Sequence, residues 1–211
     1  MTTETMTVHE ALSELKTIDK RVIRKIDETA FCVANKHANN KINGKSIQEY
    51  KDSVAESYQS IRDLLRRRAA IRNELSKSNA ATTIMIGGKE YTVAEAIEMR
   101  KTGVNLLDYL NTAMSAQFKN ATRTVHNENE SLDDKADRYV QGLYGSKDKA
   151  NADDANKARE AYITANTIDL IDPINASEEM GKIADEIDLF QHEVDSKISV
   201  SNALTTITIS Y

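Results

Sequence analysis

Two stretches of nine residues decide the fold: residues 78–86 read SNAATTIMI and residues 201–209 read SNALTTITI. Seven of the nine positions are identical, although 123 residues separate the two stretches. In each, an Asn precedes alternating Thr and Ile, a pattern typical of a strand with one buried face. We expect Asn79 and Asn202 to end helices in the left-handed conformation that Asn tolerates, with the strands following. The two stretches therefore indicate an internal duplication of one module.

The starts of the two modules also match. Residues 7–11 read TVHEA and residues 92–96 read TVAEA, and each begins with the T-x-x-E capping box of a helix. From start to repeated stretch, the first copy has 80 residues and the second 118, so 38 residues are extra in the second copy. We place this insertion at about residues 130–172.

The chain therefore divides into two predicted repeats. Residues 1–91 form repeat 1, a helical hairpin followed by a strand hairpin. Residues 92–211 form repeat 2, a helical hairpin that holds the insertion and ends in a C-terminal strand.

Apolar residues at three- and four-residue steps predict the helices of repeat 1. The first helix carries such a stripe from Val8 to Val33, and Cys32 lies late in it. A polar loop at residues 36–45 follows. A second helix begins at the capping box of Ser46 and runs to Lys77, antiparallel to the first.

Repeat 2 is predicted to begin with a helix whose stripe runs from Val93 to Val125 and continues toward Leu143. Residues 145–154 are polar and indicate a loop. A helix at about residues 153–165 and an IDPIN turn precede the last helix. Its apolar face carries Met180, Ile183, Ile187, Phe190, Val194 and Ile198.

The strands complete the prediction. Gly87 and Gly88 form a two-residue turn that returns the first repeated strand as a hairpin, and residues 2–6 supply a further short strand. Half-buried strands leave unpaired edges, so we expect the two repeated strands to pair with each other about a pseudo-twofold axis. The predicted fold is mainly α: tandem-duplicated, long antiparallel helical hairpins, similar to coiled coils, joined by a small β-ribbon of the repeated SNAxTTIxI strands.

Composition favours a soluble helical protein. Charged residues make up 29% of the chain, and one Pro, seven Gly and no Trp leave few turn signals. The net charge of −5 argues against specific nucleic-acid binding and against anionic membranes. The N-terminus has no secretion signal, and the longest uncharged stretch, residues 198–211, is too short for a membrane helix. A single cysteine suits a reducing compartment, so we expect the cytoplasm of a bacterial host.

The sequence predicts no catalytic, cofactor-binding or metal-ligating residue. His9, His37, His126 and His192 have no partners at metal-ligand spacing, and we expect them on the surface. Cys32 is expected to be a buried structural thiol rather than a nucleophile. Lys89 follows glycines and precedes a helix, but its strand pattern favours a hairpin over a phosphate site.

Two charged segments need an explanation. Arg62, Arg66, Arg68 and Arg72 wrap around their helix, which favours a solvated surface over a nucleic-acid site. Arg68 falls on the apolar stripe, so it requires a carboxylate from the first helix if it is buried. The acidic cluster of Asp148, Asp153 and Asp154 lacks the pattern of a calcium loop and indicates a helix start.

The matched ends of the two repeats resemble the septicolysin-like family of small helical bacterial and prophage proteins. The residues that carry this resemblance are Glu10, Ala11, Leu12, Asn79, Ala80, Thr82, Gly88, Asn202, Thr205 and Thr206. The likeness covers about half of the chain, and residues 36–45 and 130–172 are additions to the family pattern. It implies a helical fold with a short ribbon, in a family largely without assigned function.

We therefore expect a non-enzymatic structural or interaction protein. The leading hypothesis is a bacteriophage virion or assembly component that bridges other subunits in a homo- or hetero-oligomer, which would place some copies in a phage particle. A phage factor that binds a host defence protein is an alternative. An oligomeric pore-forming protein, as the family name suggests, is another, and a ligand-binding enzyme between the two repeats ranks last.

Overall fold

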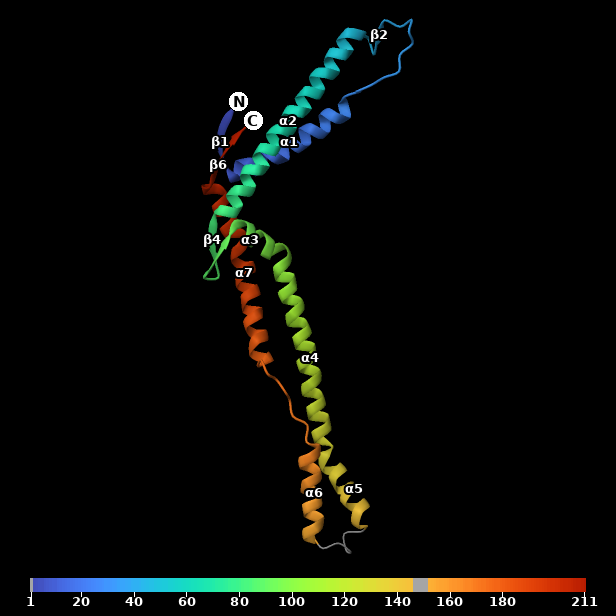
Figure 1. The fold of residues 1–211 in the computed structure, drawn as a ribbon, viewed down its shortest axis with the longest axis vertical. Helices are drawn as coiled ribbons and strands as arrows, with labels where there is room; N and C mark the ends of the chain where they lie inside the picture. The colour runs from blue at the N-terminus through green and yellow to red at the C-terminus, as the bar shows by residue number, and fades with distance from the viewer. Residues whose placement is uncertain (1, 146–151) are drawn as a thin grey trace. The chain divides into compact units, whose positions relative to one another are not determined.

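The computed structural model describes residues 2–145 and 152–211, and it is mainly helical (Figure 1). The helices are α1 (Val8–Glu28), α2 (Ile47–Ala81), α3 (Val93–Glu98), α4 (Val104–Glu130), α5 (Leu132–Tyr144), α6 (Ala152–Asn166) and α7 (Ala176–Leu204), with a π-helical turn (Met99–Gly103) between α3 and α4. The strands are β1 (Thr3–Thr7), β2 (Lys41–Ile42), β3 (Lys45–Ser46), β4 (Thr83–Ile86), β5 (Lys89–Thr92) and β6 (Thr206–Ser210). The predicted fold class, mainly α with small antiparallel strand pairs, is confirmed.

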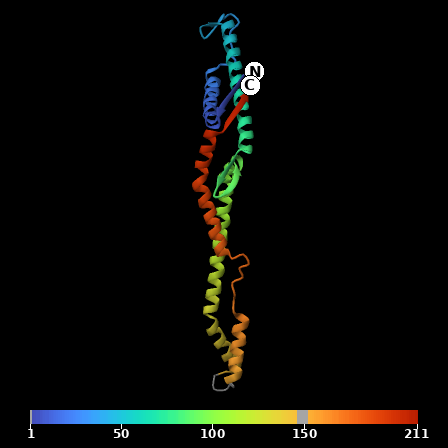
Figure 2. The same cartoon turned by 90° about the vertical axis from the view of Figure 1, so that its left-hand side faces the viewer.

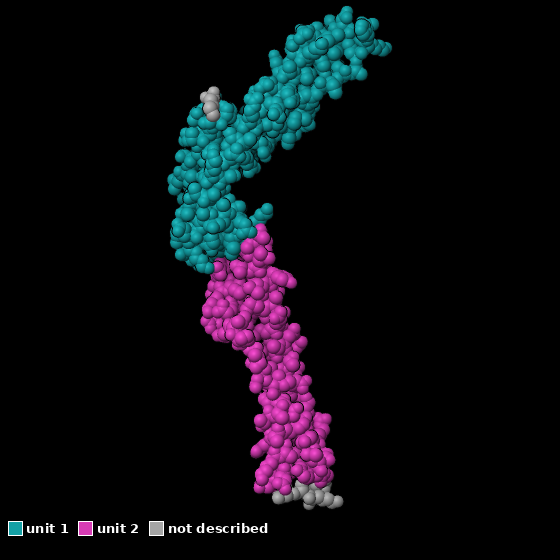
Figure 3. All heavy atoms as spheres, in the orientation of Figure 1, with its two compact units in different colours: residues 1–101, 189–211 teal, residues 102–188 magenta. Residues whose placement is uncertain are grey.

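Contacts group the chain into two compact units (Figure 3). Unit 1 holds residues 1–101 and 189–211, and unit 2 holds residues 102–188. The repeat boundaries 1–91 and 92–211 stay a prediction about the sequence, because the contacts group the residues in a different way. None of the described helices has the length and apolar content needed to cross a bilayer.

The predicted capping boxes start the helices. At the start of α1, the Oγ1 of Thr7 accepts the Glu10 N–H at 3.1 Å, and the Glu10 carboxylate accepts the Thr7 N–H at 2.8 Å. At the start of α3, Thr92 and Glu95 make the same two bonds at 3.1 and 2.7 Å. Ser46 caps α2 with the corresponding pair of bonds to Glu49. These side chains satisfy amide groups that a helix start leaves without partners.

Each repeated strand pairs with a strand that ends at a capping Thr, so the predicted pairing of the two repeated strands with each other is wrong. β4 pairs with β5 across the Gly87-Gly88 turn, and β6 pairs with β1. The registers are equivalent: Thr83 faces Thr92 in one pair, and Thr206 faces Thr7 in the other. A two-residue turn closes the first pair with little loss of chain entropy, and the predicted strand at residues 2–6 provides the equivalent partner for β6.

The connections from helix to strand are also equivalent. The Val93 N–H donates to the Thr82 carbonyl at 2.9 Å, and the Val8 N–H donates to the Thr205 carbonyl at 2.9 Å. Both views of the chain show β1 and β6 side by side, with the two ends of the chain close together (Figure 2). The backbone of Thr2 and Tyr211 extends this pair by two further bonds, at 3.1 and 3.2 Å.

Asn79 and Asn202 do not end their helices, which corrects the sequence prediction. Both lie inside helices, α2 and α7, which continue to Ala81 and Leu204. After α2 the chain turns directly into extended backbone at Thr82, whose N–H donates to the Ser78 carbonyl at 2.8 Å. No left-handed residue is required, because the strand begins at once.

The first helix ends five residues earlier than predicted. α1 stops at Glu28, where Thr29 becomes extended and its Oγ1 donates to the Lys25 carbonyl at 2.5 Å. The last residue of the predicted stripe, Val33, therefore lies in an exposed segment beyond the helix. The predicted loop at residues 36–45 contains part of a small β2–β3 hairpin. Its turn is Asn43-Gly44, with φ values of 48° and 82°, the positive values that favour this dipeptide in two-residue turns.

The core of unit 1 lies where α1 and α2 pack together and the β1–β6 pair covers them. Its buried residues are Val8, Ala11, Leu15, Ile18, Val22, Ile61, Ile71, Leu75, Ile207 and Ile209. The Ile residues of β6 point inward while its Thr and Ser residues are exposed, as the alternation predicts. A second group, around the β4–β5 hairpin, brings Tyr91 against Phe190 with ring centroids 5.7 Å apart. Phe190, Val194 and Ile198 of α7 are buried there, as the predicted stripe requires.

Unit 2 is built from α4, α5, α6 and the first part of α7. The predicted continuation of the first helix toward Leu143 is present but interrupted at Ser131, where α5 begins. The predicted helix at residues 153–165 is α6, and it starts within the predicted loop at 145–154; residues 146–151 of that loop lie outside the described residues. α5 and α6 pack together through the stacked rings of Tyr139 and Tyr162, whose centroids are 4.7 Å apart.

Candidate functional site

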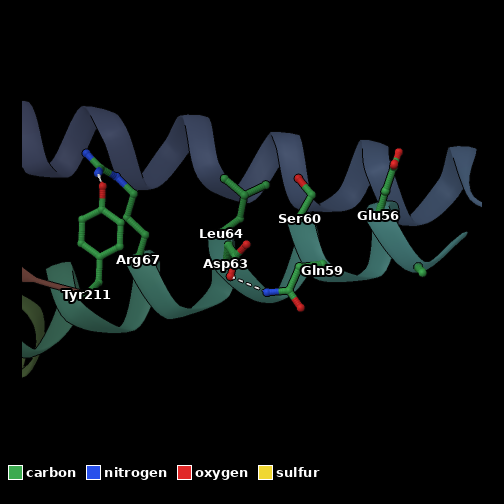
Figure 4. Close-up of a pocket in the computed structure, with 8 residues that line it drawn as sticks. Glu56, Gln59, Ser60, Asp63, Leu64, Arg67 and Tyr211 are labelled. Atoms are coloured by element: carbon green, nitrogen blue, oxygen red, sulfur yellow. Dashed lines mark hydrogen bonds between the residues drawn. The ribbon is translucent and has the colours of Figure 1, made fainter. Parts of the chain in front are cut away.

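An open groove with a volume of about 710 Å³ runs along α2 in unit 1 and ends at Tyr211 (Figure 4). It is lined by Ala55, Glu56, Gln59, Ser60, Asp63, Leu64, Arg67 and Tyr211. Several of the polar groups already contact one another: the Gln59 amide donates to Asp63 at 2.9 Å, and Arg66 lies 3.2 Å from the same carboxylate. Only Leu64 and Tyr211 give the groove large apolar surface.

Arg67 is the centre of the polar contacts beside Tyr211 in this groove. Its Nη2 donates to the carboxylate of Glu4 on β1 at 2.6 Å, and its Nε donates to the carboxylate of Glu14 on α1. Its Nη1 donates to the hydroxyl of Tyr211, and its guanidinium lies 4.7 Å from the centre of the Tyr211 ring. Arg67 thus connects α2 to β1 and α1 near the start of the sequence and to Tyr211 at position 211.

The charges of this cluster stabilise each other. Hydrogen bonds from Arg67 lower the pKa of Glu4 below its usual value, and bonds to Glu14 and then Glu4 raise the pKa of Arg67. Arg67 is only 19% exposed, so water screens these pairs less than it screens pairs on an open surface. Because all three guanidinium nitrogens donate within the protein, the cluster holds the fold together and has little capacity left for an external anion.

Arg68 has the carboxylate partner that the sequence predicts. Its Nε donates to Asp19 of α1 at 2.6 Å, and both side chains are about two-fifths exposed. Sequence reasoning missed Arg67, the more buried neighbour of Arg68, because two of its partners come from the ends of the chain. The only local signal was its position between Leu64 and Ile71, at steps of three and four residues on the buried face.

The four histidines are exposed, and the described residues contain no group of His, Cys, Asp and Glu side chains that could hold a metal ion. His126 lies 3.6 Å from Glu130, one turn further along α4. The glutamates adjacent in sequence to the other helical histidines serve the backbone: Glu10 caps α1, and Glu193 accepts the Gly87 N–H at 3.0 Å.

Cys32 is exposed, which corrects the prediction of a buried thiol. The prediction assumed that α1 extends to Val33, where its stripe would bury residues late in the helix. Because the helix ends at Glu28, Cys32 lies in the exposed segment that leads to the β2–β3 hairpin.

The glycine turn and the acidic cluster have structural explanations. Gly87 and Gly88 have φ values of 57° and 76°, and a Cβ at Gly87 would lie 2.8 Å from Leu189. Lys89 belongs to strand β5 of this hairpin. Asp153 and Asp154 lie in the first turn of α6, where a helix start was predicted, whereas Asp148 lies outside the described residues.

Unit 2 exposes more large apolar side chains than it buries. Among its described residues, four hydrophobic side chains are buried: Val104, Leu132, Ala136 and Ile187. Ten large ones are exposed: Leu106, Tyr109, Leu110, Tyr139, Leu143, Tyr144, Ile168, Leu170, Ile171 and Ile174. Three of them form a continuous row on α4, and four lie in the segment between α6 and α7.

The segment between α6 and α7 is held in place by side chains. The Asn129 amide donates to the Ile168 carbonyl at 2.8 Å, and its oxygen accepts the Ile168 N–H at 3.0 Å, as a neighbouring strand would. The Asp172 carboxylate accepts the Ala176 N–H at the start of α7. Ile171 nevertheless stays 84% exposed, so this segment presents an ordered apolar surface.

Comparison with known proteins does not assign the chain to a family. It matches no family model, no curated protein and no solved structure.

Proposed function

We propose that this chain is a non-enzymatic interaction protein that binds and bridges other protein subunits. The observation that carries the proposal is that the described part of unit 2 exposes ten large apolar side chains and buries three, Val104, Leu132 and Ile187. A domain that functions alone normally keeps such side chains inside, and contiguous exposed apolar residues mark places where proteins bind. The exposed groups of unit 2 therefore serve as contact surface for partner chains.

We place this role in a bacteriophage particle or in its assembly, on the strength of the resemblance to septicolysin-like prophage proteins. The equivalent registers of β1–β6 and β4–β5, with their equivalent Thr caps, support descent from two copies of one module. A protein with two related modules can hold two similar partners, which suits a component that connects repeated subunits of a virion.

The test is whether the chain is incorporated in particles through the apolar surface of unit 2. We would express the full-length tagged chain in infected host cells and measure its amount in purified particles by mass spectrometry. A Leu143→Asp, Ile171→Asp variant should reduce incorporation about tenfold or more, because each charge is placed in a desolvated interface. Lys157→Asp, an exposed change on α6, is the matched control and should leave incorporation unchanged.

Two results would contradict the proposal. Particles without the chain would remove the virion role, and specific capture of a single host defence protein would favour the alternative role as a phage counter-defence factor. Equal incorporation of the Leu143→Asp, Ile171→Asp variant and the wild-type chain would show that these apolar residues are not the contact surface.

A further inference from the structure

Helix α4 has three distinct faces. One face is turned inward and includes the buried Val104 and the half-buried Met114 and Phe118. The second carries nearly all charges of the helix, among them Asp108 and Lys119. The third is exposed apart from one half-buried residue, Ala113, and up to its last turn it contains no charged residue. Its residues are Thr102, just before α4, and Leu106, Leu110, Ala113, Gln117, Asn120 and Thr124.

The third face has the spacing of a coiled-coil seam. From Leu106 to Thr124 its residues follow at alternating steps of four and three, the a and d positions of a heptad repeat. Leu106 and Leu110 are 64% and 46% exposed, and the neighbouring Tyr109 is 75% exposed. An exposed helix face normally carries charges, so an uncharged heptad seam of this length indicates a face that another helix covers.

We propose that this seam binds a second copy of the same chain, with the two α4 helices parallel and in register. In that arrangement Leu106 and Leu110 meet their own counterparts, and Gln117 and Asn120 pair with Gln117 and Asn120 of the second copy. Polar residues at seam positions fix the register of a coiled coil in this way. An antiparallel copy would instead place Leu106 against Thr124 and leave amide groups facing apolar side chains.

Charges beside the seam favour the same arrangement. Arg123 occupies the g position that precedes Thr124, and Glu128 occupies the e position five residues further on. In a parallel two-stranded coiled coil these two positions lie opposite each other across the interface. Arg123 of each copy therefore meets Glu128 of the other, giving two ion pairs related by the twofold axis. Both side chains are exposed, and Glu128 already binds Lys135 at 2.6 Å, which leaves capacity on its carboxylate for a second donor.

The inference deepens the proposed interaction role and rests on it only in part, because it names one partner and one surface, distinct from Leu143 and Ile171. Self-association of the purified chain tests it without any phage component. Failure to dimerise with normal incorporation in particles would overturn the inference alone, whereas dimerisation with no incorporation would overturn the proposed function alone.

The first experiment measures the oligomeric state. Sedimentation equilibrium of the full chain between about 1 and 100 μM should give a dimer, and Leu110→Asp should weaken it about 100-fold. Tyr58→Asp, an exposed change on α2 away from the seam, is the control and should leave the dimer intact. Circular dichroism should be equal for all variants, because the changed residues are exposed. A wild-type chain that stays monomeric at 100 μM would overturn the proposal.

Disulfide cross-linking determines the orientation. In a Cys32→Ser background, Ala113→Cys should form a disulfide between copies rapidly on mild oxidation, because residue 113 of each copy faces itself in the parallel register. A chain that carries both Leu106→Cys and Thr124→Cys should link 106 to 106 and 124 to 124. Links between 106 and 124 would show an antiparallel pair and overturn the proposed geometry.

A charge exchange tests the ion pairs. Arg123→Glu and Glu128→Arg should each weaken the dimer, by about tenfold for the two symmetric pairs, and the double exchange should restore most of the loss. A mixture of the two single variants should form heterodimers in preference to homodimers. If the double exchange did not restore the dimer, the proposed pairing of Arg123 with Glu128 between the two copies would be rejected.

Discussion

Unit 1 buries about as many large apolar side chains as it exposes, whereas unit 2 exposes more of them than it buries. Among described residues, sixteen hydrophobic side chains are buried in unit 1 and four in unit 2. Unit 1 also contains the three capping boxes and the Arg67 cluster. The larger buried core therefore belongs to unit 1, and in the proposed role the exposed apolar side chains of unit 2 are the contact surface for partner chains.

The largest expected effect comes from the core of unit 1. Ile71→Ala removes a side chain with no exposure and should lower the free energy of unfolding by about 3 kcal/mol. Hydrogen exchange should show the loss at the amides of α1 and α2, with the amides of α5 and α6 unaffected. Equal loss of protection in α5 and α6 would break the contrast between the two units.

Arg67 should come next. Arg67→Met keeps most of the side-chain volume but leaves the Glu4 and Glu14 carboxylates without their shared donor, and should destabilise unit 1 by about 2 kcal/mol in urea denaturation. Arg66→Met is the matched control, because that side chain is 63% exposed and pairs only within α2. A similar effect of both changes would remove the special role of Arg67.

The two Thr caps should have equal effects. Thr7→Ala and Thr92→Ala each remove a side-chain acceptor at a helix start and should each lower stability by about 1 kcal/mol, while Ser at either position should retain most of it. Thermal melts of the four variants would measure this. Unequal effects would show that the two caps differ in energy although the registers of their strand pairs are equivalent.

Acid should act mainly on unit 1. The pKa values of Glu10, Glu49 and Glu95 are lowered, chiefly by backbone N–H groups at the capping residues, and that of Asp19 is lowered by Arg68. A lowered pKa in the folded state gives stability that is present above the usual value, near 4.5 for Glu, and is lost as the pH falls through the folded value. Melting temperatures at pH 7, 4.5 and 3 should therefore decline below about pH 4.5, with α1 to α3 losing protection first, and Glu10→Gln should reduce the decline.

The smallest effect should come from the exposed surface of unit 2. Ile171→Ser changes a side chain that is 84% exposed, and the free energy of unfolding should change by less than about 0.5 kcal/mol. Chemical denaturation of the purified chain measures this. A large destabilisation would mean that Ile171 is buried in solution. The contrast between the two units in exposed apolar side chains would then be smaller than the structure indicates.

Local signals in the sequence predicted much of this fold. The capping boxes at Thr7, Ser46 and Thr92 and the Gly87-Gly88 turn depend on residues three or fewer positions apart, and all are present in the structure. The partner of β6 was harder to identify, because its choice between β1 and β4 is decided by contacts between distant segments.

The errors have the same origin. Asn79 fits a left-handed helix end by its own preference, but the strand that follows makes that conformation unnecessary. The prediction that Cys32 is buried depended on where α1 ends, and no strong signal in the sequence marks that position. Arg67 was not recognised because two of its partners, Glu4 and Tyr211, lie at the two ends of the chain. The exposed seam on α4 could be recognised only once burial showed which of its faces is covered.

Because β1 pairs directly with β6, the fold does not require that residues 2–87 precede residues 88–211 along the chain. Thr2 and Tyr211 already exchange backbone hydrogen bonds, so a short Gly-Gly link could join them without moving either strand. The chain could then be opened between Gly87 and Gly88, where the other hairpin turns. Such a circular permutant would contain the same strand pairs and the same helices, with new ends at what is now a closed turn.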